Sequence, residues 1–455
     1  MFRKVLIANR GEIAVRVIRA CRELGVGTVA VYSTADREAL HVRLADERIC
    51  IGPPPSEQSY LNIGAMISAA EARGCDAVHP GYGFLSENGD FAEACHRSGL
   101  AFIGPRVRNI KLMGDKARAR RFMRRAGVPV LPGSSSSVRT LDEASNVARD
   151  VGFPVLVKAT GGGGGRGLRV VRDEQQLAAA IDAARSEGQA AFGQPKIYLE
   201  KYIERARHIE FQIIADQERN ALHLGERECS LQRRYQKVME ESPSPALDHR
   251  LRTRMGRSAL RVATAIGYTN VGTVEFLLDA SGAYYFIEMN TRVQVEHPVT
   301  EAVTGLDIVK QGIRAAAGLP LSIRQRDVAF RGHALECRIN AEDPMTMRPS
   351  PGTVRALRLP GGPGLRVDTA LYAGATVPPQ YDSLIAKLVA HGSDRGEAIA
   401  RMRSALAELQ VEGIATNAAM HAALLEDGDV LAGRVHTCFL EDWLSERTLR
   451  PARAS

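Results

Sequence analysis

Polar side chains occupy every second position from 288 to 296. They are Glu288, Asn290, Arg292, Gln294 and Glu296, separated by mostly apolar residues. In a strand, alternate residues point to one face, so one face would carry carboxylates, amides and a guanidinium. Carboxylate and amide oxygens suit a hard cation held with nucleotide phosphates, such as Mg²⁺. The guanidinium fork suits a small oxyanion, and a carboxylate beside it can act as a general base. A solvated sheet face is the alternative, although Asn is depleted in strands.

One straight strand cannot bring these groups to one ligand. At about 3.3 Å per residue, Glu288 and Glu296 would lie about 26 Å apart. We therefore expect the strand to end near Arg292 and the chain to bend back. Glu275 ends an earlier strand-like run, and it would supply a second carboxylate from the neighbouring strand.

A glycine run forms a second candidate site. Glycines fill positions 161–165 and 167, between the apolar runs 154–159 and 168–171. Glycines that join two strands let backbone N–H groups approach phosphate oxygens, and Lys158 could add a point charge. The pattern is not a Walker A loop, so phosphate would bind under a mobile lid and not at a helix N-terminus. A simple flexible hairpin is the alternative.

Four further segments carry weaker signals. Arg338 lies in an alternating run at 336–340, and His208 precedes Glu210 in a strand-like run. The segment 231–237 reads as a basic loop, with a surface loop as the alternative. The Gly/Pro-rich turn at 79–88 is either a plain loop or a substrate contact.

The N-terminal segment predicts a βαβ unit with a parallel sheet. Strand-like runs at 5–8 and 28–32 flank a helix with an apolar stripe. Asn9 and Glu12 have the spacing of a capping box. The turn holds one glycine, Gly11, where a dinucleotide fingerprint needs three, so a nicotinamide or flavin dehydrogenase is a minor interpretation.

The later segments predict a hinge, a small lobe and a large domain. Residues 106–133 are polar and basic and read as a hinge. The lobe closes at about 198–201, and the rest, from about 203, reads as one α+β domain without an internal repeat. The basic patch at 116–125 has little aromatic interleaving, so a solvated helix face is favoured over nucleic-acid binding.

Composition is that of an ordinary globular chain. The 455 residues are 45% hydrophobic and 25% charged, which predicts about three domains. No run approaches the roughly 18 apolar residues of a membrane span. Seven cysteines without a Cys-x-x-Cys pair indicate a reducing cytosol. The net charge of +8 is compatible with anionic small substrates.

Taken together, the motifs resemble those of biotin carboxylase, the ATP-grasp subunit of acetyl-CoA carboxylase and related biotin enzymes. The matching stretches are 7–14, 79–88, 114–116, 158–167, 232–234, 236–237, 288–300 and 336–344. They span nearly the whole chain in order, which makes the resemblance specific.

The resemblance implies an α/β and α+β multidomain architecture with an ATP-grasp fold. A Rossmann-like N-terminal domain would cover 1–112. A hinge and lid would cover 113–203, with the lid at about 131–203. The remainder of the ATP-grasp and a C-terminal biotin carboxylase domain would cover 204–455.

By similarity, the motifs also imply site residues. ATP contacts would be Lys116, Lys158, Gly163, Gly164, Gly165, Gly167, Glu200, Lys201, Ile203, His208, Gln232, Tyr235 and Leu277; metal ligands Glu275, Glu288 and Asn290; bicarbonate contacts Lys237, Arg292, Gln294 and Val295; biotin contacts Tyr82 and Arg338; and catalytic residues Glu296, Arg292, Arg338 and Lys237.

The implied reaction is that of a ligase that consumes ATP and bicarbonate and carboxylates biotin at N1′, with Mg²⁺ or Mn²⁺, expected as two ions. Glu296 would deprotonate bicarbonate for attack on the γ-phosphate. The resulting carboxyphosphate would break down to CO₂ and phosphate, and the phosphate would take the biotin proton. Arg338 would stabilise the biotin enolate.

The implied partners are a biotin carboxyl carrier protein and carboxyltransferase subunits, in fatty acid biosynthesis if acetyl-CoA is the acceptor. No Met-Lys-Met occurs, so biotin would arrive on another chain. A cytoplasmic homodimer is expected, with neither nucleic acid nor membrane as partner. Many relatives carry His where this chain has Tyr235.

Two other functions compete with this interpretation. A different ATP-grasp ligase would activate another carboxylate, but the run from Arg292 to Glu296 together with Arg338 suits bicarbonate and biotin. A catalytically silent ATP-binding subunit is disfavoured because Lys158, Glu288 and Asn290 are all present.

Overall fold

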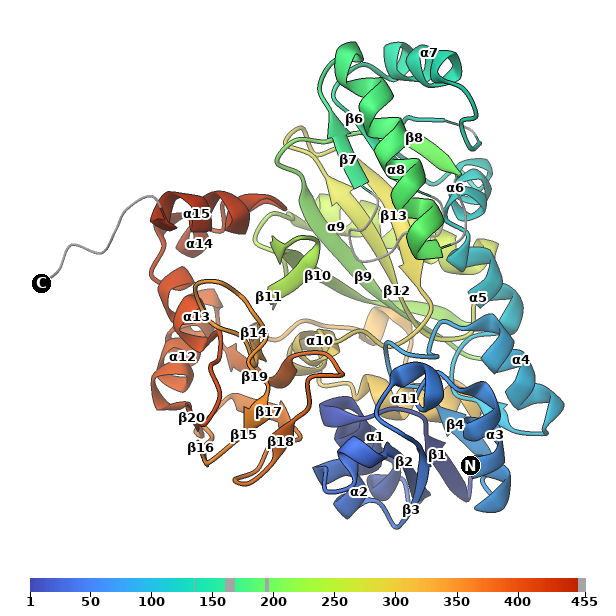
Figure 1. Cartoon of the computed structure of the whole chain (residues 1–455), viewed down its shortest axis with the longest axis vertical. Coiled ribbons are helices and arrows are strands. Elements are labelled where there is room, and N and C mark those ends of the chain that lie inside the picture. The colour runs from blue at the N-terminus through green and yellow to red at the C-terminus, as the bar shows by residue number, and fades with distance from the viewer. Residues whose placement is uncertain (135, 160–167, 193–195, 449–455) are drawn as a thin grey trace, which may run out of the picture.

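The computed structural model describes residues 1–134, 136–159, 168–192 and 196–448. Figure 1 shows the N-terminal sheet at the bottom in blue and a small green sheet at the top, with the C-terminal helices at the left in red. A long central sheet runs between these regions. The predicted mixture of α/β and α+β organisation is confirmed.

The N-terminal region is a five-stranded parallel sheet in the order β3-β2-β1-β4-β5. Its elements are β1 Lys4–Ile7, α1 Gly11–Glu23, β2 Gly27–Ser33, α2 Leu40–Leu44, β3 Glu47–Gly52, α3 Ile63–Ala72, β4 Ala77–His79, α4 Gly89–Arg97 and β5 Ala101–Phe102. The predicted βαβ unit is confirmed, because β1 and β2, which precede and follow α1 in the sequence, pair in parallel.

The predicted capping box is wrong. Helix α1 has Arg10 at its N-cap and no side-chain cap. Nδ2 of Asn9 donates instead to the carbonyls of Pro80 and Tyr82, 2.7 Å from each. Glu12 lies 3.1 Å from Nζ of Lys387, far along the chain. Both side chains are used in tertiary contacts, which local spacing cannot reveal.

The predicted hinge at 106–133 is largely helical. It contains α5 Val107–Gly114 and α6 Lys116–Arg125. The expected solvated face of α6 has an exception, because Arg120 is buried and pairs with Glu200 at 3.2 Å. It also donates to the carbonyl oxygen of Leu131. A salt bridge therefore joins α6 to the last strand of the small lobe, which is described next.

The small lobe is a three-stranded antiparallel sheet in the order β7-β6-β8. Its elements are α7 Leu141–Val151, β6 Val155–Ala159, β7 Leu168–Val171, α8 Leu177–Phe192 and β8 Ile197–Lys201. The predicted strands are confirmed. The glycine run, with Gly163, Gly164, Gly165 and Gly167, lies outside the described residues.

The centre of the molecule is an eight-stranded sheet. Its strand order is β13-β12-β9-β10-β11-β14-β19-β17. Its strands are β9 Arg207–Ala215, β10 Ala221–Arg233, β11 Gln236–Ser242, β12 Asn270–Leu278, β13 Tyr284–Asn290, β14 His333–Asn340, β17 Leu365–Thr369 and β19 Leu384–Gly392. Helices α9 His249–Ala265, α10 His297–Thr304 and α11 Ile308–Ala316 connect or cover them. The segment predicted as a basic loop is a hairpin of β10 and β11, in which Gln232 pairs with Lys237.

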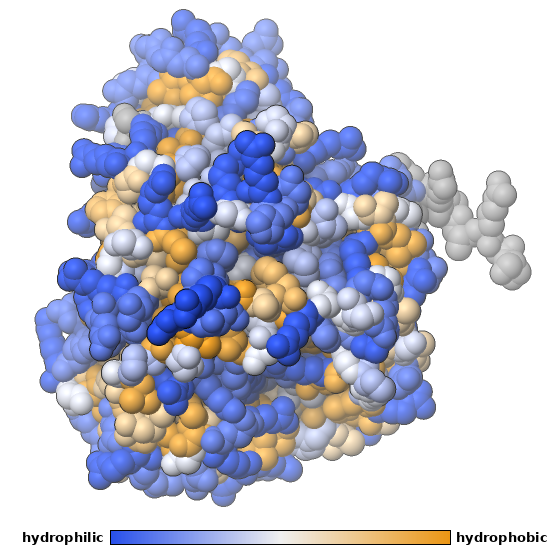
Figure 2. Space-filling model, turned by 180° about the vertical axis from the view of Figure 1, so that it is seen from behind, coloured by the Kyte–Doolittle hydropathy of each residue, from blue (hydrophilic) through white to orange (hydrophobic). Residues whose placement is uncertain are grey.

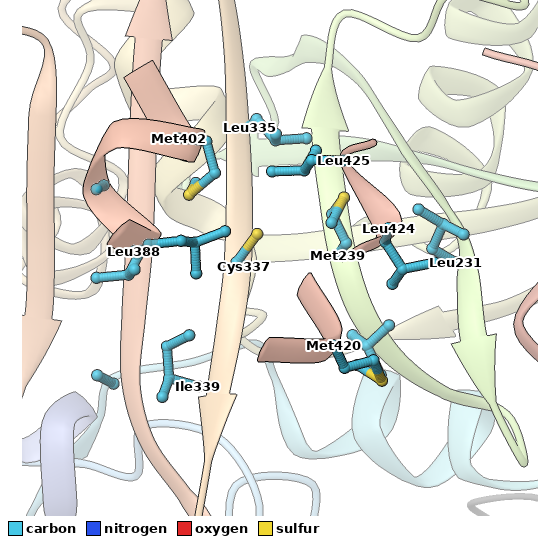
Figure 3. Close-up of a cluster of buried hydrophobic side chains, with 14 of the residues drawn as sticks. Leu231, Met239, Leu335, Cys337, Ile339, Leu388, Met402, Met420, Leu424 and Leu425 are labelled. Carbon is cyan, nitrogen blue, oxygen red and sulfur yellow. The ribbon is translucent and has the colours of Figure 1, made fainter. Parts of the chain in front are cut away.

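The C-terminal part covers one end of this sheet. Its further elements are β15 Gly352–Thr353, β16 Ala356–Arg358, β18 Thr376–Val377, α12 Arg395–Glu408, β20 Gln410–Glu412, α13 Ala418–Leu424, α14 Gly428–Leu431 and α15 Phe439–Thr448. Figure 3 shows how Met239 and Cys337 point from β11 and β14 into a core with Met402 and Leu424.

This core decides where the neighbouring polar side chains go. Because strand residues alternate between faces, burial of Met239 and Cys337 turns Glu240 and Arg338 to the opposite side, where they meet. In Figure 2, hydrophilic residues cover much of the rear surface, with hydrophobic patches between them. Within the described residues, no helix is long and apolar enough to cross a membrane.

Candidate active site

Cross-strand register brings the predicted acidic residues together. Glu275 of β12 is opposite Glu288 of β13 on one side and Glu210 of β9 on the other. Direct cross-strand partners have their Cβ atoms about 5 Å apart on one face. Three carboxylates therefore line neighbouring strands, as expected for Glu275 and Glu288. Glu210 was not among the predicted site residues.

Lys237 neutralises this acidic face. Its Nζ lies 2.6 Å from Oε1 of Glu296 and 3.0 Å from Oε1 of Glu275, and it also donates to Glu210. Arg338 reaches the other oxygen of Glu296 at 2.9 Å. We call Glu210, Lys237, Glu275, Glu296 and Arg338 the central cluster.

Electrostatics keeps the key members of the cluster charged. Burial alone would raise the pKa of Glu296, but Lys237 and Arg338 outweigh it and hold that pKa well below its usual range. Burial would likewise lower the pKa of Lys237, but Glu210, Glu275 and Glu296 raise it well above its ordinary value. Glu296 is therefore ionised and Lys237 protonated at neutral pH.

The bend predicted near Arg292 is confirmed, although the strand ends two residues earlier. Strand β13 ends at Asn290, and α10 begins at His297 with Glu296 at its N-cap. Within the bend, Nη1 of Arg292 donates to Gln294 at 2.8 Å and Nη2 donates to Asn290 at 3.2 Å. The carbonyl of Val295 accepts a hydrogen bond from Lys387. The bend returns Glu296 to the sheet, where it meets Lys237.

The N-terminal region supplies a partner that the sequence did not single out. Glu87 accepts from Nε of Arg292 at 2.8 Å and from the backbone N–H of Thr291 at 2.9 Å. Glu87 lies in the turn at 79–88, so this turn is more than a plain connection. A glutamate that precedes a helix carries no local signal for a partner about 200 residues away.

Tyr82 and Arg338 have separate anchors. The hydroxyl of Tyr82 donates to Glu12 of α1. Nε of Arg338 donates to Glu240 at 2.5 Å. Burial raises the pKa of Tyr82 well above its usual value, with Glu12 adding to the shift and Arg338 opposing it. The hydroxyl is therefore a hydrogen-bond donor at neutral pH.

Two lysines extend the site towards the small lobe. Nζ of Lys116 lies 2.7 Å from Glu288, and Nζ of Lys158 lies 2.5 Å from Glu200 of β8. Glu288 raises the pKa of Lys116 against the opposing effect of burial. Helix α6 and the small lobe thus present ammonium groups suited to phosphate oxygens.

The other predicted nucleotide contacts differ in their partners and in their exposure. His208 lies 3.1 Å from Glu275 and 2.6 Å from Nε2 of Gln232. The side chain of Lys201 points back to the carbonyls of Gly152 and Phe153, 2.9 Å from each. Tyr235 is 50% exposed in the β10–β11 turn. Ile203 and Leu277 are half-buried apolar residues.

The residues present fit a hard cation. Glu275 and Glu288 are carboxylates on adjacent strands, and Nδ2 of Asn290 donates to Oε1 of Glu275 at 2.8 Å. Ligand atoms of His208, Glu210 and Glu275 also lie within 4.8 Å of one another. This oxygen-rich set is of the kind that Mg²⁺ and Mn²⁺ use.

Three family models match the chain in order. They are the biotin carboxylase N-terminal domain at residues 1–110, the ATP-binding domain of the carbamoyl-phosphate synthase L chain at 115–324, and the biotin carboxylase C-terminal domain at 336–442.

Known proteins resemble the chain along its whole length. The biotin carboxylase of Pseudomonas aeruginosa is 57% identical over 442 residues, which cover 97% of this chain and 98% of that protein. A Campylobacter jejuni biotin carboxylase crystal structure, a beta-gamma-ATP complex, aligns with a TM-score of 0.95 at 48% identity and covers 97% and 99% of the two chains. The biotin carboxylase domain dimer of Hydrogenobacter thermophilus 2-oxoglutarate carboxylase, with MgADP, ADP and bicarbonate, aligns with a TM-score of 0.95 at 47% identity over 100% of both chains.

Proposed function

Because the chain belongs to the biotin carboxylase family, we propose that its central cluster carries out that family's reaction with the residues named below. The protein is a ligase that carboxylates biotin with bicarbonate and ATP, giving carboxybiotin, ADP and phosphate. The observation that carries the assignment of roles is the convergence of Lys237 and Arg338 on the buried carboxylate of Glu296.

Glu296 is the base that accepts the proton of bicarbonate. It is fully buried and ionised, so it needs no prior loss of a proton. Bicarbonate drawn to Lys237 and Arg292 would compete with Glu296 for the ammonium of Lys237. The basicity of Glu296 therefore rises when its substrate is in place. Gln294 and the backbone of Val295 complete the bicarbonate site.

Phosphoryl transfer depends on Lys116, Lys158 and the acidic strand residues. Glu275, Glu288 and Asn290 would hold two Mg²⁺ or Mn²⁺ ions, which when bound neutralise charge on the transferring phosphoryl group. Lys116 and Lys158 bind phosphate oxygens. In this structure each of the two lysines pairs with a glutamate. When the nucleotide binds, its phosphates would replace these carboxylates, so each ammonium group keeps a negatively charged partner.

The remaining nucleotide contacts come from residues in and next to the strands near these lysines. His208 and Gln232 meet phosphates or ribose, with Tyr235 beside the ribose. Glu200 and Lys201 bind the adenine edge, between the apolar walls of Ile203 and Leu277. The product of the first step is carboxyphosphate, from which carbon dioxide and phosphate are released beside biotin.

Arg338 and Tyr82 form the biotin end of the site. Nε and Nη2 of Arg338 are bound to Glu240 and Glu296. Nη1 has no hydrogen-bond acceptor among the residues that the structure describes. This free edge is the donor that stabilises negative charge on the ureido oxygen of biotin.

The partners are a biotin carboxyl carrier protein and a carboxyltransferase, with a cytoplasmic homodimer as the working form. The dimeric state of the Hydrogenobacter relative supports the homodimer. Acetyl-CoA or a related acyl-CoA is the proposed final acceptor, with the carboxyltransferase making that choice. The same relative serves a 2-oxoglutarate carboxylase, so similarity to this domain does not select the acceptor.

Steady-state ATP hydrolysis tests the proposed function. The purified protein with Mg²⁺ should hydrolyse ATP only when bicarbonate is present, and free biotin should raise the rate. Hydrolysis that is indifferent to both bicarbonate and biotin would overturn the proposal. Carboxybiotin trapped from labelled bicarbonate identifies the product directly.

A further inference from the structure

Arg338 is held by a second glutamate besides Glu296, and Nη2 of Arg338 lies close to both. Nε of Arg338 donates to Oε1 of Glu240 at 2.5 Å, and Glu240 is 1% exposed. The two residues lie on neighbouring strands, β11 and β14, with Glu240 diagonal to Arg338 in the ladder. Because a guanidinium is planar, a bond at Nε fixes the plane in which Nη1 and Nη2 lie.

Glu240 has an unusual cross-strand neighbour. Its direct partner in the ladder is Glu336, which is fully buried. Within the described part of the chain, both carboxyl oxygens of Glu336 and Oε2 of Glu240 have no hydrogen-bond partner. Two buried carboxylates directly opposite each other repel, so ionising both is unfavourable. The pair therefore holds at least one proton.

The surrounding charges are consistent with a proton on this pair. Lys387 of β19, Arg338 of β14, Lys237 of β11 and Glu296 before α10 act on one or both glutamates. Burial raises the pKa of Glu240 to about 7 and that of Glu336 well above its usual range, against the opposing effects of Arg338 and Lys387. Burial would lower the pKa of Arg338, but Glu240, Glu296 and Glu336 in turn raise it, so its guanidinium stays charged.

We propose that Glu240 is a positioning residue for the biotin half of the reaction: it holds Nε of Arg338 so that the free Nη1 edge faces the biotin ureido oxygen. The proposal rests on the proposed function, because it assigns Arg338 to biotin. The proposal requires no contact between Glu240 and either ATP or bicarbonate. The reach of the Glu240 side chain, more than its charge, sets the position of the guanidinium.

Three variants separate reach from charge. Glu240→Gln keeps an oxygen acceptor at the same reach, whereas Glu240→Asp keeps the acid but withdraws it by one methylene. Glu336→Gln is the matched control, since it changes the buried partner that does not touch Arg338. For each, the KM for free biotin, kcat with biotin, and the bicarbonate-dependent ATPase rate without biotin are measured.

Glu240→Asp should lower biotin-dependent kcat/KM by about ten-fold or more, the size expected for a lost hydrogen bond to a charged group. The rate without biotin should stay within about two-fold. Glu240→Gln should keep biotin-dependent kcat/KM within about three-fold of wild type, and Glu336→Gln should match wild type.

Three results would overturn the proposal. One is a normal biotin response in Glu240→Asp. Another is an equal loss of the rates with and without biotin, which indicates a merely structural role. The third is a Glu240→Gln enzyme as impaired as Glu240→Asp. If the wild-type enzyme showed no biotin response, the proposed function itself would fail, so the two failures are distinguishable.

Discussion

Nζ of Lys237 lies 2.6 Å from Oε1 of Glu296, and both side chains are at most about a tenth exposed. Lys237 comes from the start of β11, and Glu296 comes from the bend before α10. The pair places a group for binding an anion beside a carboxylate that can accept its proton. Binding and deprotonation of one small acid can thus happen at one point.

Replacement of Glu296 by Gln should remove the base and leave the shape of the site intact. We expect turnover to fall by at least about a hundred-fold, the usual contribution of a general base. Nucleotide affinity should stay within about three-fold, because Glu296 is bound to Lys237 and Arg338 and not to Lys116 or Lys158. Steady-state ATPase rates and nucleotide titration measure the two effects. The control is Glu226→Gln, a buried glutamate bound to Arg252, and an equal loss of nucleotide binding in Glu296→Gln would contradict the base assignment.

Glu87 should affect bicarbonate through Arg292. Glu87→Gln removes a carboxylate that accepts from Nε of Arg292. Because the Glu87 side chain is 38% exposed, water weakens the pair, so we expect a rise in bicarbonate KM of only about two- to five-fold. The KM for ATP should not change. Glu93→Gln is a matched control, since Glu93 is 37% exposed and pairs with Lys111 and Arg97. An unchanged bicarbonate KM would rule out this positioning role.

Tyr235 combines a strained backbone with the proposed ribose contact. Its φ is +65°, a left-handed conformation that Asn tolerates better than Tyr. Tyr235→Asn should keep or slightly raise the thermal midpoint, yet raise the KM for ATP by about three-fold or more as the ring is lost. Arg219→Asn is the control, because Arg219 has a φ of +72° in the β9–β10 turn and is exposed. A normal ATP KM in Tyr235→Asn would exclude the contact.

His421 should make the protein sensitive to mild acid. It is fully buried, its Nε2 donates to the carbonyl oxygen of Arg338 at 2.8 Å, and burial lowers its pKa to about 4. The unfolded chain binds this proton near pH 6.5, whereas the folded chain does not until about pH 4. Its contribution to stability is therefore complete above pH 6.5 and is lost as pH falls through that window, by about 2 kcal/mol at pH 5.

Thermal midpoints at pH 7 and pH 5 test this. The wild-type midpoint should fall more between the two pH values than that of His421→Gln, which has no group to protonate. His96→Gln, at an exposed position, should follow wild type at both pH values. Parallel losses in wild type and His421→Gln would show that His421 does not contribute.

Much of the site could be predicted because strand faces follow a period of two. Alternation alone placed Glu288 and Asn290 on one face, and the chain length across 288–296 required the bend that occurs after β13. The parallel βαβ start and the strands on either side of the glycine run also follow from local pattern. Even so, spacing misled where side chains act at a distance, as Asn9 and Glu12 show.

The amino-acid sequence by itself determined which residue types sit on which strand face, and through its motifs the family and its reaction. Only the tertiary structure decided which buried charges meet: Glu87 with Arg292, Glu240 with Arg338, and Lys237 with three glutamates. The reason is that side-chain alternation is set by neighbouring residues, whereas pairing of buried charges depends on the order and register of strands far apart in the chain. A buried charge is stable only beside its partner, and no local pattern identifies that partner.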